Sequence, residues 1–294
     1  SDLSAKLAHQ MKNANKYGLE SVTPEFDFKK IMGRVHNVIS KIEPHDSVER
    51  YTDLGVECIQ GAAKIISPWE VEVNGKTLTT QNITIATGAG PFVPPIPGLE
   101  KIIPLTSENL WQLEALPKRM IVLGGGPIGC EMAQSFSRLG SHVTQVEMMD
   151  RIMGIEDPEV SQIVEDKFKS EGVNVLTKHK AKEVKVVDER KVLIVEFEGK
   201  DIEIDFDEIL VAVGRRANIK GFGAEELGVK LRQNQTIEAN EYLETNFPNI
   251  YVCGDVTGPF QLTHTAAHQA WYCAVNALFG KLKKFKVDYS VIPW

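Results

Sequence analysis

A glycine-rich segment near the middle of the chain restricts most strongly how the protein can fold. The apolar run Met120 to Leu123 predicts a buried strand, and it is followed directly by Gly124 to Gly129, which has the spacing G-x-G-x-x-G. Residues 132–139 then predict a helix, and residues 142–146 predict a second strand that ends in Glu147. A strand, a glycine turn, a helix and a strand in this order are typical of a parallel α/β fold.

Every part of this segment can serve in binding a dinucleotide. Gly124 permits a tight turn, Gly126 lets the backbone approach a pyrophosphate, and Gly129 lets the helix pack closely on the strand. The start of the helix offers free N–H groups to the phosphates. Glu147, eighteen residues after Gly129, can accept hydrogen bonds from a ribose 2′-hydroxyl and would repel a 2′-phosphate, despite the nearby Arg151. We therefore expect NAD rather than NADP at this turn, and a purely structural glycine turn is the alternative.

The residues that follow complete an α/β domain. Asp157-Pro158 predicts the start of a helix, and Gly172 predicts its end. We expect the three strands of an antiparallel crossover over residues 173–177, 183–187 and 192–197. Residues 209–213 predict a strand that returns to the main sheet and ends at Gly214.

The parts on either side predict shorter elements. Residues 1–43 predict two helices separated by a turn-rich stretch, and residues 265–278 predict another helix. Short strands are expected over residues 56–66, 69–74, 82–86 and 250–253. Asn74-Gly75 predicts a hairpin turn after the second of these strands. The proline-rich residues 91–97 cannot continue a helix or a central strand, so we expect an extended connection there.

Composition excludes several classes of protein. Forty acidic side chains outnumber 33 Lys and Arg, for a formal charge of −7, which disfavours an electrostatic nucleic-acid binder. No apolar stretch approaches the roughly 18 residues of a membrane span, and the first residues do not resemble a signal peptide. The four cysteines have neither metal nor redox spacing, so we expect a reducing, cytoplasmic setting. We predict no catalytic residue and no metal site among these residues.

Four motifs resemble those of the flavoprotein disulfide reductases (pyridine nucleotide-disulfide oxidoreductases), most of all their dihydrolipoamide dehydrogenase and mercuric reductase branch. The motifs are Ala86-Thr87-Gly88, Gly124-Gly125-Gly126-x-Ile128-Gly129-x-Glu131, Gly214-Arg215-Arg216 and Tyr251-x-Cys253-Gly254-Asp255. The resemblance implies an α/β fold with two Rossmann-like, three-layer dinucleotide-binding domains, one for FAD and one for NAD. The NAD domain, residues 117–245, would be inserted in an incomplete FAD domain. The two parts of that FAD domain would be residues 1–116 and 246–294, the second leading toward a dimerisation domain.

The resemblance also implies which residues hold the two cofactors. The NAD site would consist of Gly124, Gly125, Gly126, Pro127, Ile128, Gly129, Glu131, Glu147, Ala181 and Gly214. The FAD site would consist of Ala63, Thr87, Gly88, Ala89, Asp255, Leu262, Thr263 and His264. Asp255 would hold the ribityl chain, and Ala63 would lie beside the adenine. Leu262 to His264 would present backbone to the flavin ring at a helix start, whose dipole stabilises negative charge on a reduced flavin.

Other parts of the family pattern do not occur in these residues. The family begins with a glycine fingerprint for FAD and a redox pair of cysteines followed by a lysine, and it ends with a dimerisation domain that carries a His-Glu pair. Residues 1–17 look like the helix that follows the cysteine pair, so we expect a fragment of a longer, homodimeric flavoenzyme. Glu131, whose lysine partner would lie in the missing part, is expected to be unpaired. We expect the chain alone to be inactive and to carry little FAD.

The activity implied by the resemblance has two half-reactions. NADH would pass a hydride to FAD, and the reduced flavin would reduce an active-site disulfide that hands electrons to a disulfide or metal-ion substrate. Two alternatives stay open. One is a flavin-dependent NADH dehydrogenase that passes electrons to a quinone or ferredoxin, and the other is a non-enzymatic NAD-binding regulatory module.

Single residues also depart from the family pattern. Ala217 replaces a proline and Cys253 replaces an alanine, which we interpret as packing variation. Gln269 replaces a glutamate, so we expect one charge fewer near the surface of the flavin domain. We expect His264 to pack or to orient backbone rather than to act as an acid or base.

Overall fold

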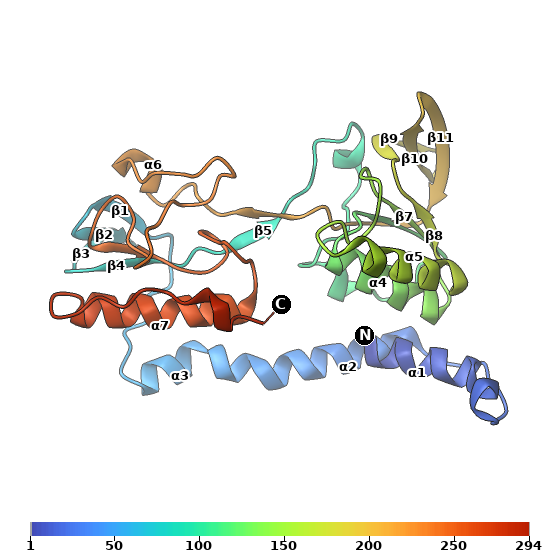
Figure 1. The fold of residues 1–294 in the computed structure, drawn as a ribbon, viewed down its shortest axis with the longest axis horizontal. Helices are drawn as coiled ribbons and strands as arrows, with labels where there is room; N and C mark the ends of the chain where they lie inside the picture. Colours follow the sequence, from blue (N-terminus) through green and yellow to red (C-terminus); the bar gives the residue numbers. More distant parts are fainter. Residues whose placement is uncertain (1, 294) are drawn as a thin grey trace. The chain divides into compact units, whose positions relative to one another are not determined.

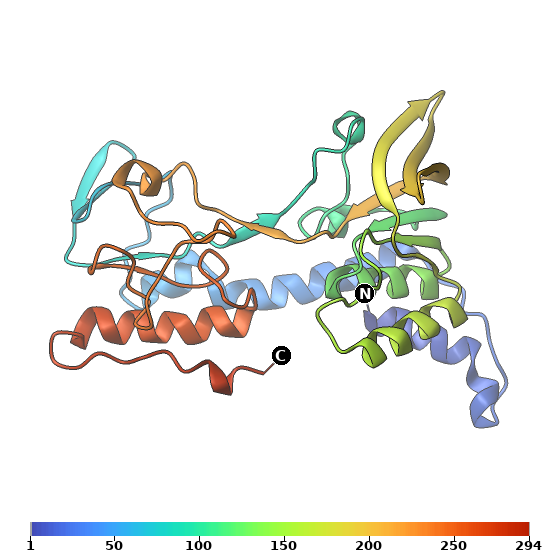
Figure 2. The same ribbon diagram turned by 45° about the horizontal axis from the view of Figure 1, so that its top comes forward.

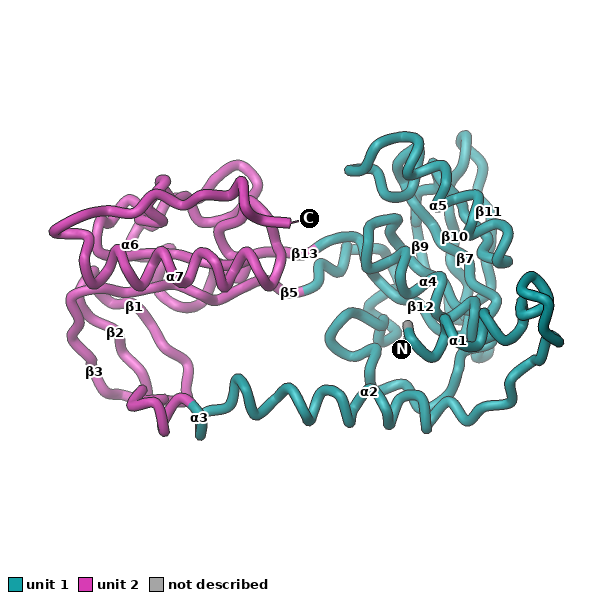
Figure 3. The backbone as a smooth tube through the Cα atoms, turned by 60° about the horizontal axis from the view of Figure 1, so that its bottom comes forward, with its two compact units in different colours: residues 1–50, 91–214 teal, residues 51–90, 215–294 magenta. Residues whose placement is uncertain are grey.

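The computed structural model of the protein describes residues 2–293, and these form two compact units (Figure 1). Unit 1, teal in Figure 3, consists of the residues up to Arg50 together with residues 91–214. Unit 2, magenta in Figure 3, consists of residues 51–90 and the residues from Arg215 onward. The divisions between the units do not coincide with the boundaries at 116 and 245 expected for the cofactor domains, which remain predictions.

Unit 1 is built on a four-stranded parallel sheet in the order β12-β6-β7-β8. Its strands are β6 (Arg119–Leu123), β7 (His142–Val146), β8 (Asn174–Leu176) and β12 (Glu208–Val211). Leu123 lies opposite both Val146 and Val211, so β6, β7 and β12 end at the same edge of the sheet. Residues 120–123 are at most 2% exposed. Their burial on both faces explains why β6 is an uninterrupted apolar run.

The parallel sheet is the middle of three layers. Met120 and Val122 pack in a core shared with the helices α1 (Asp2–Lys12), α2 (Phe28–Ile42), α4 (Pro127–Leu139) and α5 (Pro158–Ser170). Ile121 and Leu123 pack in a second core shared with the antiparallel strands β9 (Lys180–Val187), β10 (Arg190–Phe197) and β11 (Lys200–Phe206). Figure 2 shows these antiparallel strands in yellow and gold. Because side chains alternate along a strand, β6 contributes to both cores.

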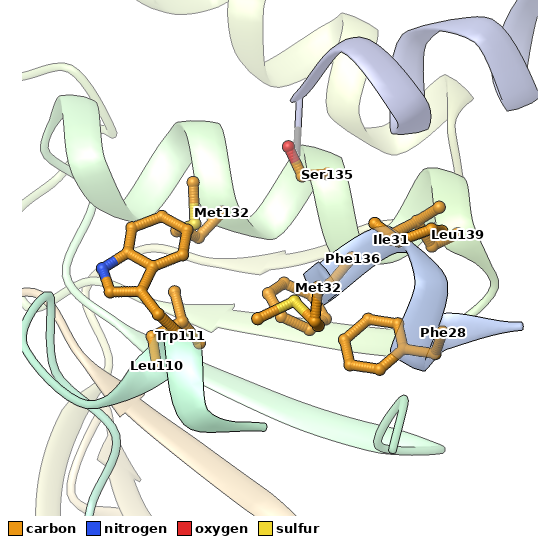
Figure 4. Close-up of a pocket in the computed structure, with 9 residues that line it drawn as sticks. All are labelled: Phe28, Ile31, Met32, Leu110, Trp111, Met132, Ser135, Phe136 and Leu139. Carbon is orange, nitrogen blue, oxygen red and sulfur yellow. The ribbon is translucent and has the colours of Figure 1, made fainter. Parts of the chain in front are cut away.

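Helix α4 is held in place by packing at its sides and by a glycine at its end. Gly140 has a φ of +114°, and its N–H donates to the carbonyls of Phe136 and Ser137, which closes the helix. Helix α2 and the short 3-10 helix η4 (Leu110–Gln112) contact each other and line, together with α4, an apolar hollow of about 10 Å³ (Figure 4). This volume has room for about one water molecule, so the hollow is a packing gap rather than a ligand site.

Two strands of unit 1 differ from the sequence prediction. A strand was correctly expected over residues 173–177, but its antiparallel partner was wrong, because β8 pairs with β7 in the parallel sheet. Helix α5 carries the chain back across the sheet, so β8 must run in the same direction as β7, and a three-residue strand carries no pattern that specifies its neighbour. The edge strand β11 was not predicted. Four of its seven residues are charged and its first four are exposed, but Ile202, Ile204 and Phe206 alternate with charged residues, so a signal for a strand was present.

Unit 2 contains a parallel pair of strands, β4 (Ile83–Ile85) and β14 (Ile250–Val252), and helix α7 (Thr263–Phe279) packs on β14. A separate antiparallel sheet has the order β1-β2-β3. Its strands are β1 (Lys64–Ser67), β2 (Glu70–Val73) and β3 (Lys76–Thr79). Asn74 and Gly75 both have a positive φ, as a type I′ turn requires, so the predicted hairpin turn is confirmed. The strand expected over residues 56–66 was wrong for residues 56–63, which form no strand.

The remaining elements are short. They are α3 (Val48–Asp53), α6 (Ala224–Leu227), β5 (Ala89–Pro91), β13 (Arg215–Ala217) and the 3-10 helices Ala14–Tyr17, Glu43–Asp46, Leu99–Lys101 and Tyr289–Val291. Strand β13 pairs with β5. None of the helices within residues 2–293 is long and apolar enough to cross a membrane.

Candidate functional site

The glycine turn between β6 and α4 uses two of its glycines for close backbone contacts. Gly124 has a φ of +109°, and a Cβ at this position would overlap the carbonyl oxygen of Ala212, whose own N–H donates to the Leu123 carbonyl (2.8 Å). A Cβ on Gly129 would overlap the carbonyl oxygen of Gly124. Both positions therefore require glycine for the protein to fold in this way, whatever it binds.

Gly126 is different from these two glycines. Its φ of −75° is open to any residue, and no heavy atom outside its immediate neighbours lies within 4 Å of the position that a Cβ would take. A glycine at Gly126 is thus not needed for packing. It leaves open space at the start of α4, where a close approach of a ligand to the backbone would need it.

The N-terminus of α4 faces this space without a cap. Gly126 is the N-cap residue, Pro127 takes the first helical position, and no side chain accepts a hydrogen bond from the first turn. Ile128, in the same turn, is 43% exposed. The N–H groups of a first helical turn have no acceptor within the helix, and the helix dipole adds positive potential there. The arrangement suits a phosphate group.

Glu147 follows β7 and reaches back to the glycine turn. Its Oε2 accepts a hydrogen bond from the Gly125 N–H (2.6 Å), and its Oε1 accepts one from the Met149 N–H (2.7 Å). A Cβ on Gly125 would lie only 3.0 Å from Glu147 Oε2 and from Ile152 Cα, so the middle glycine of the triplet makes room for this carboxylate. A carboxylate has about four lone-pair positions, so Glu147 can still accept hydrogen bonds from a ribose.

Two side chains support the glycine turn from beneath. The fully buried Gln145 donates from Nε2 to the Gly124 carbonyl (3.0 Å). The thiol of Cys130 donates to the Gly125 carbonyl (3.4 Å), which also accepts from the Met153 N–H (2.6 Å). Burial raises the pKa of Cys130, so this cysteine is a neutral thiol at pH 7.

The structure places the other expected NAD residues around the same turn or on neighbouring strands. Gly214 follows β12 with a φ of +126° and is exposed, and its carbonyl accepts from the Phe92 N–H (3.0 Å). Ala181 lies half-buried on β9 and packs against the core that contains Leu123. Glu131 is exposed on α4 and forms no salt bridge within residues 2–293. Arg151 donates to the carbonyls of Gly154 and Glu156, so its guanidinium is held by its own loop.

In unit 2, the expected flavin residues gather where β4 and β14 end. Val252 lies opposite Ile85, so Thr87 and Asp255 both follow the same edge. Asp255 Oδ2 lies 3.3 Å from Nε of Arg215, and Arg215 also donates to the Ala89 carbonyl. The structure thus brings Ala89 and Asp255 together through an arginine.

Asn218 holds the loop after β4. Thr87 Oγ1 donates to the Asn218 carbonyl (2.7 Å), and Asn218 Nδ2 donates to the Thr87 carbonyl (2.9 Å). The Asn218 N–H donates to the carbonyl of Gly88, which has a φ of +67°. This reciprocal bonding fixes Thr87 and Gly88 in one conformation.

The remaining expected flavin residues lie at a helix start and before a strand. Leu262 is the N-cap residue of α7, and no side chain caps that helix. Thr263 and His264 form its exposed first turn, and His264 Nε2 lies 2.8 Å from the carbonyl oxygen of Pro293. Ala63 is exposed and directly precedes β1.

Comparison with known proteins decides the family. The model of the pyridine nucleotide-disulphide oxidoreductases matches residues 4–270. The chain belongs to this family. The expected α/β fold with dinucleotide-binding domains is therefore confirmed, as is the resemblance on which it was based.

Individual relatives show how much of the family's length this member covers. A dihydrolipoyl dehydrogenase of Acholeplasma laidlawii is 40% identical over 291 residues, which are 97% of this chain and 84% of that protein. A mercuric reductase of Staphylococcus aureus is 32% identical over 276 residues, 94% of this chain and 50% of that protein. The HOCl-induced flavoprotein disulfide reductase RclA from Escherichia coli superposes with a TM-score of 0.78 at 25% identity, over 90% of this chain and 60% of that chain. The chain thus spans about half to four-fifths of these relatives.

Gln269 has a different place in this family member from the one expected. It is fully buried rather than near the surface, so the expected effect on surface charge was wrong. Its Oε1 accepts from the Gly254 N–H (2.6 Å), and its Nε2 donates to the Gly258 carbonyl (2.7 Å) and to Tyr289 Oη (2.8 Å). An ionised carboxylate could not donate the last two bonds. Gln269 therefore ties both ends of the Gly254–Gly258 loop to α7.

Sequence reasoning missed several residues that shape the two edges. They are Gln145, Cys130, Arg215, Asn218 and the structural role of Gln269. For Gln145 a signal was present, because it stands two residues after Val143, where a strand points its side chain to the same face as that valine. Within residues 2–293, no three His, Cys, Asp or Glu side chains lie close enough together to hold a metal ion.

Proposed function

We propose that this chain supplies the NADH-binding domain and part of the FAD-binding domain of an oxidoreductase. The complete enzyme would move a hydride from NADH to FAD and pass electrons on to a disulfide or metal-ion substrate. The observation that carries the proposal is the open space over Gly126 at the uncapped start of α4, with Glu147 at the end of the neighbouring strand. The family implies FAD and a nicotinamide dinucleotide as cofactors, and the residues of the turn fit the dinucleotide.

Each residue of the turn has a role in this proposal. The N–H groups at the start of α4 bind the diphosphate, since they have no other acceptor in the helix. Glu147 accepts hydrogen bonds from the adenosine ribose and repels a 2′-phosphate, which favours NADH over NADPH. Arg151 does not counter this preference, because two carbonyls of its own loop already hold its guanidinium.

The edge of unit 2 fits the flavin in part. Thr87, Gly88 and Ala89 form a fixed loop beside Asp255, and the first turn of α7 offers uncapped N–H groups. FAD, when bound, supplies the hydride acceptor and the electron relay. Asp255 would share its carboxylate between Arg215 and a ribityl hydroxyl. Leu262, Thr263 and His264 would orient backbone toward the flavin ring, and Ala63 would lie beside the adenine.

The activity, substrate and partners of the whole protein are part of the proposal. The named activities of the relatives, dihydrolipoyl dehydrogenase, mercuric reductase and flavoprotein disulfide reductase, favour the disulfide-reductase mechanism over a quinone or ferredoxin reductase and over a regulatory module. We propose a homodimer in the cytoplasm for the complete enzyme. The redox cysteines and the His-Glu pair of the family would come from outside these residues.

Exchange of the ribose-binding carboxylate tests the NADH preference. In Glu147→Arg, both the ribose acceptor and the acceptor for the Gly125 N–H are lost, so we expect NADH to bind about tenfold more weakly or worse. NADPH should bind more tightly than it does to the unchanged protein, because the arginine attracts its 2′-phosphate. Both dissociation constants can be measured by quenching of protein fluorescence.

A second charge reversal controls for the change in net charge. Glu159 is exposed in the first turn of α5, so Glu159→Arg should leave both dissociation constants within about a factor of two. An unchanged preference for NADH in Glu147→Arg would contradict the ribose assignment. Absence of any dinucleotide binding by the unchanged chain would overturn the proposed function itself.

A further inference from the structure

A buried glutamine lies under the glycine turn, on a strand whose other core-facing side chains are apolar. Gln145 is fully buried and shares a face of β7 with Val143. Its Nε2 donates to the Gly124 carbonyl (3.0 Å), but its Oε1 has no hydrogen-bond partner within residues 2–293. A buried acceptor without a partner costs free energy of folding. Stability alone therefore does not explain why this strand carries a glutamine.

The peptide unit between Gly124 and Gly125 connects Gln145 to Glu147. The carbonyl of this peptide accepts from Gln145 Nε2, and the N–H of the same peptide donates to Glu147 Oε2 (2.6 Å). In a planar trans peptide the C=O and N–H groups point in opposite directions. Gln145 on one side and Glu147 on the other therefore hold one rigid plane between them.

The next peptide of the turn is held from the inside as well. The Gly125 carbonyl accepts from the Met153 N–H (2.6 Å) and from the thiol of Cys130 (3.4 Å). The N–H of Gly126 in the same plane consequently points away from the core, toward the open space above Gly126. Two successive peptides are thus oriented by contacts beneath the turn.

We propose that Gln145 is a positioning residue for ribose recognition, which rests on the proposed binding of NADH at this turn. By holding the Gly124 carbonyl, Gln145 keeps the Gly125 N–H aimed at Glu147 and so keeps that carboxylate in place for the ribose hydroxyls. Without the donor at position 145, the peptide can rotate and release Glu147. The discrimination between NADH and NADPH then falls together with the affinity for NADH.

The test replaces the amide by a side chain of similar length that cannot donate. In Gln145→Met we expect NADH to bind about tenfold more weakly, while the dissociation constant of NADPH changes less than that of NADH. The dissociation constant of NADPH divided by that of NADH should therefore fall. The reason is that a displaced Glu147 no longer favours the 2′-hydroxyl or repels the 2′-phosphate. Both ligands are titrated against the 294-residue chain.

Two further variants make the result decisive. Thr144→Val changes the neighbouring residue on the other face of β7, where the Thr144 side chain is half-buried and makes no contact with the glycine turn, so both dissociation constants should stay as they are. Gln145→Val places a residue typical of buried parallel strands at the same position and serves if the methionine variant does not fold.

The outcomes separate this inference from the proposed function. If the unchanged chain does not bind NADH, both are wrong. If the unchanged chain binds NADH and the Gln145 variants weaken the binding of NADH and of NADPH by the same factor, the glutamine only supports the turn, and the inference is overturned. The same holds if neither constant changes. A fall in the ratio with unchanged folding, judged by circular dichroism, supports it.

Discussion

The two units end their parallel strands in different ways. In unit 1, β6 of the four-stranded parallel sheet leads to a turn in which backbone atoms leave no room for a Cβ at Gly124 and Gly129, and Gly126 faces open space. In unit 2, β14 of the parallel pair leads to the Gly254–Gly258 loop, which is held by the side chain of Gln269, while Asp255 is held by Arg215. At the first edge, main-chain contacts decide where glycine is required, and Gln145 and Glu147 orient one peptide of the turn. At the second edge, the side chain of Gln269 holds the loop at both ends.

This difference teaches where each edge is vulnerable. The contact glycines of the unit 1 turn tolerate no Cβ, because backbone atoms already occupy the position that a Cβ would take. A loop held by buried polar groups is sensitive to the loss or exchange of a single donor, because the group left behind has no partner in the interior. Substitutions at the two edges should therefore fail in different ways.

The largest effect on NADH binding is expected at Gly126, the glycine of the unit 1 turn that faces open space. A valine at Gly126 is compatible with its φ of −75°, and its Cβ meets no neighbouring atom, but the side chain fills the space over the helix start. We expect Gly126→Val to weaken NADH binding by more than about a hundredfold, roughly 2.7 kcal/mol, with unchanged thermal unfolding. Titration calorimetry together with circular dichroism checks both parts.

The matched control is Gly124, a neighbouring glycine that is required for folding rather than for ligand binding. Gly124→Ala should lower the free energy of unfolding by about 1–3 kcal/mol or more, because the methyl group overlaps the Ala212 carbonyl at a φ of +109°. If Gly126→Val bound NADH normally, the contrast between contact glycines and the ligand-facing glycine would be wrong.

An intermediate effect is expected at the loop of unit 2. Gln269→Glu introduces the charge that the family resemblance implied at this position, but an ionised carboxylate would face the Gly258 carbonyl and lose the donors to Gly258 and Tyr289. We expect the free energy of unfolding of unit 2 to fall by about 1–3 kcal/mol at pH 7. Hydrogen exchange resolved by segment should show faster exchange in residues 250–258 and unchanged exchange in β6 and β7. Equal loosening of both units would contradict the local role of Gln269.

The smallest effect concerns an ion pair at the other end of β6. Hydrogen bonds from Arg119, at 2.6 Å from Nη2 and 2.7 Å from the backbone N–H, hold the pKa of Asp207 below its usual range. A carboxyl whose pKa is lower in the folded protein stabilises it above the unfolded pKa, and this contribution is lost as the pH falls through the lowered folded value. Because the pair is partly exposed, we expect it to contribute only about 0.5 kcal/mol to the free energy of unfolding.

Denaturant unfolding of the Asp207→Asn variant measures this contribution. Its stability should lie below that of the unchanged protein at pH 7, and the two should converge as the pH falls below the usual range of aspartate. A difference that persists at low pH would show that the carboxylate does not act through its charge. Neither result should alter the Gly254–Gly258 loop in unit 2.

Much of the local structure was predictable because it depends on neighbours in the chain. The buried strand at residues 120–123, the glycine turn and the helix after it follow from apolar periodicity and from the positive φ that only glycine adopts readily. The hairpin at Asn74-Gly75 follows from turn chemistry in the same way. The order of the four motifs was enough to indicate the family. Gly124 and Gly126 belong to one of these motifs, and Glu147 was expected from its place at the end of the following strand.

Contacts between distant segments could be decided only by the tertiary structure. The partner of β8, the bond from Gln145 to Gly124, the pairing of Arg215 with Asp255 and the burial of Gln269 each join residues that no local pattern connects. A local pattern reports which face of an element is apolar, because that depends on the period of the helix or strand. Which donor meets which acceptor inside the core depends on how the chain brings separate elements together, and no local stretch of sequence shows that.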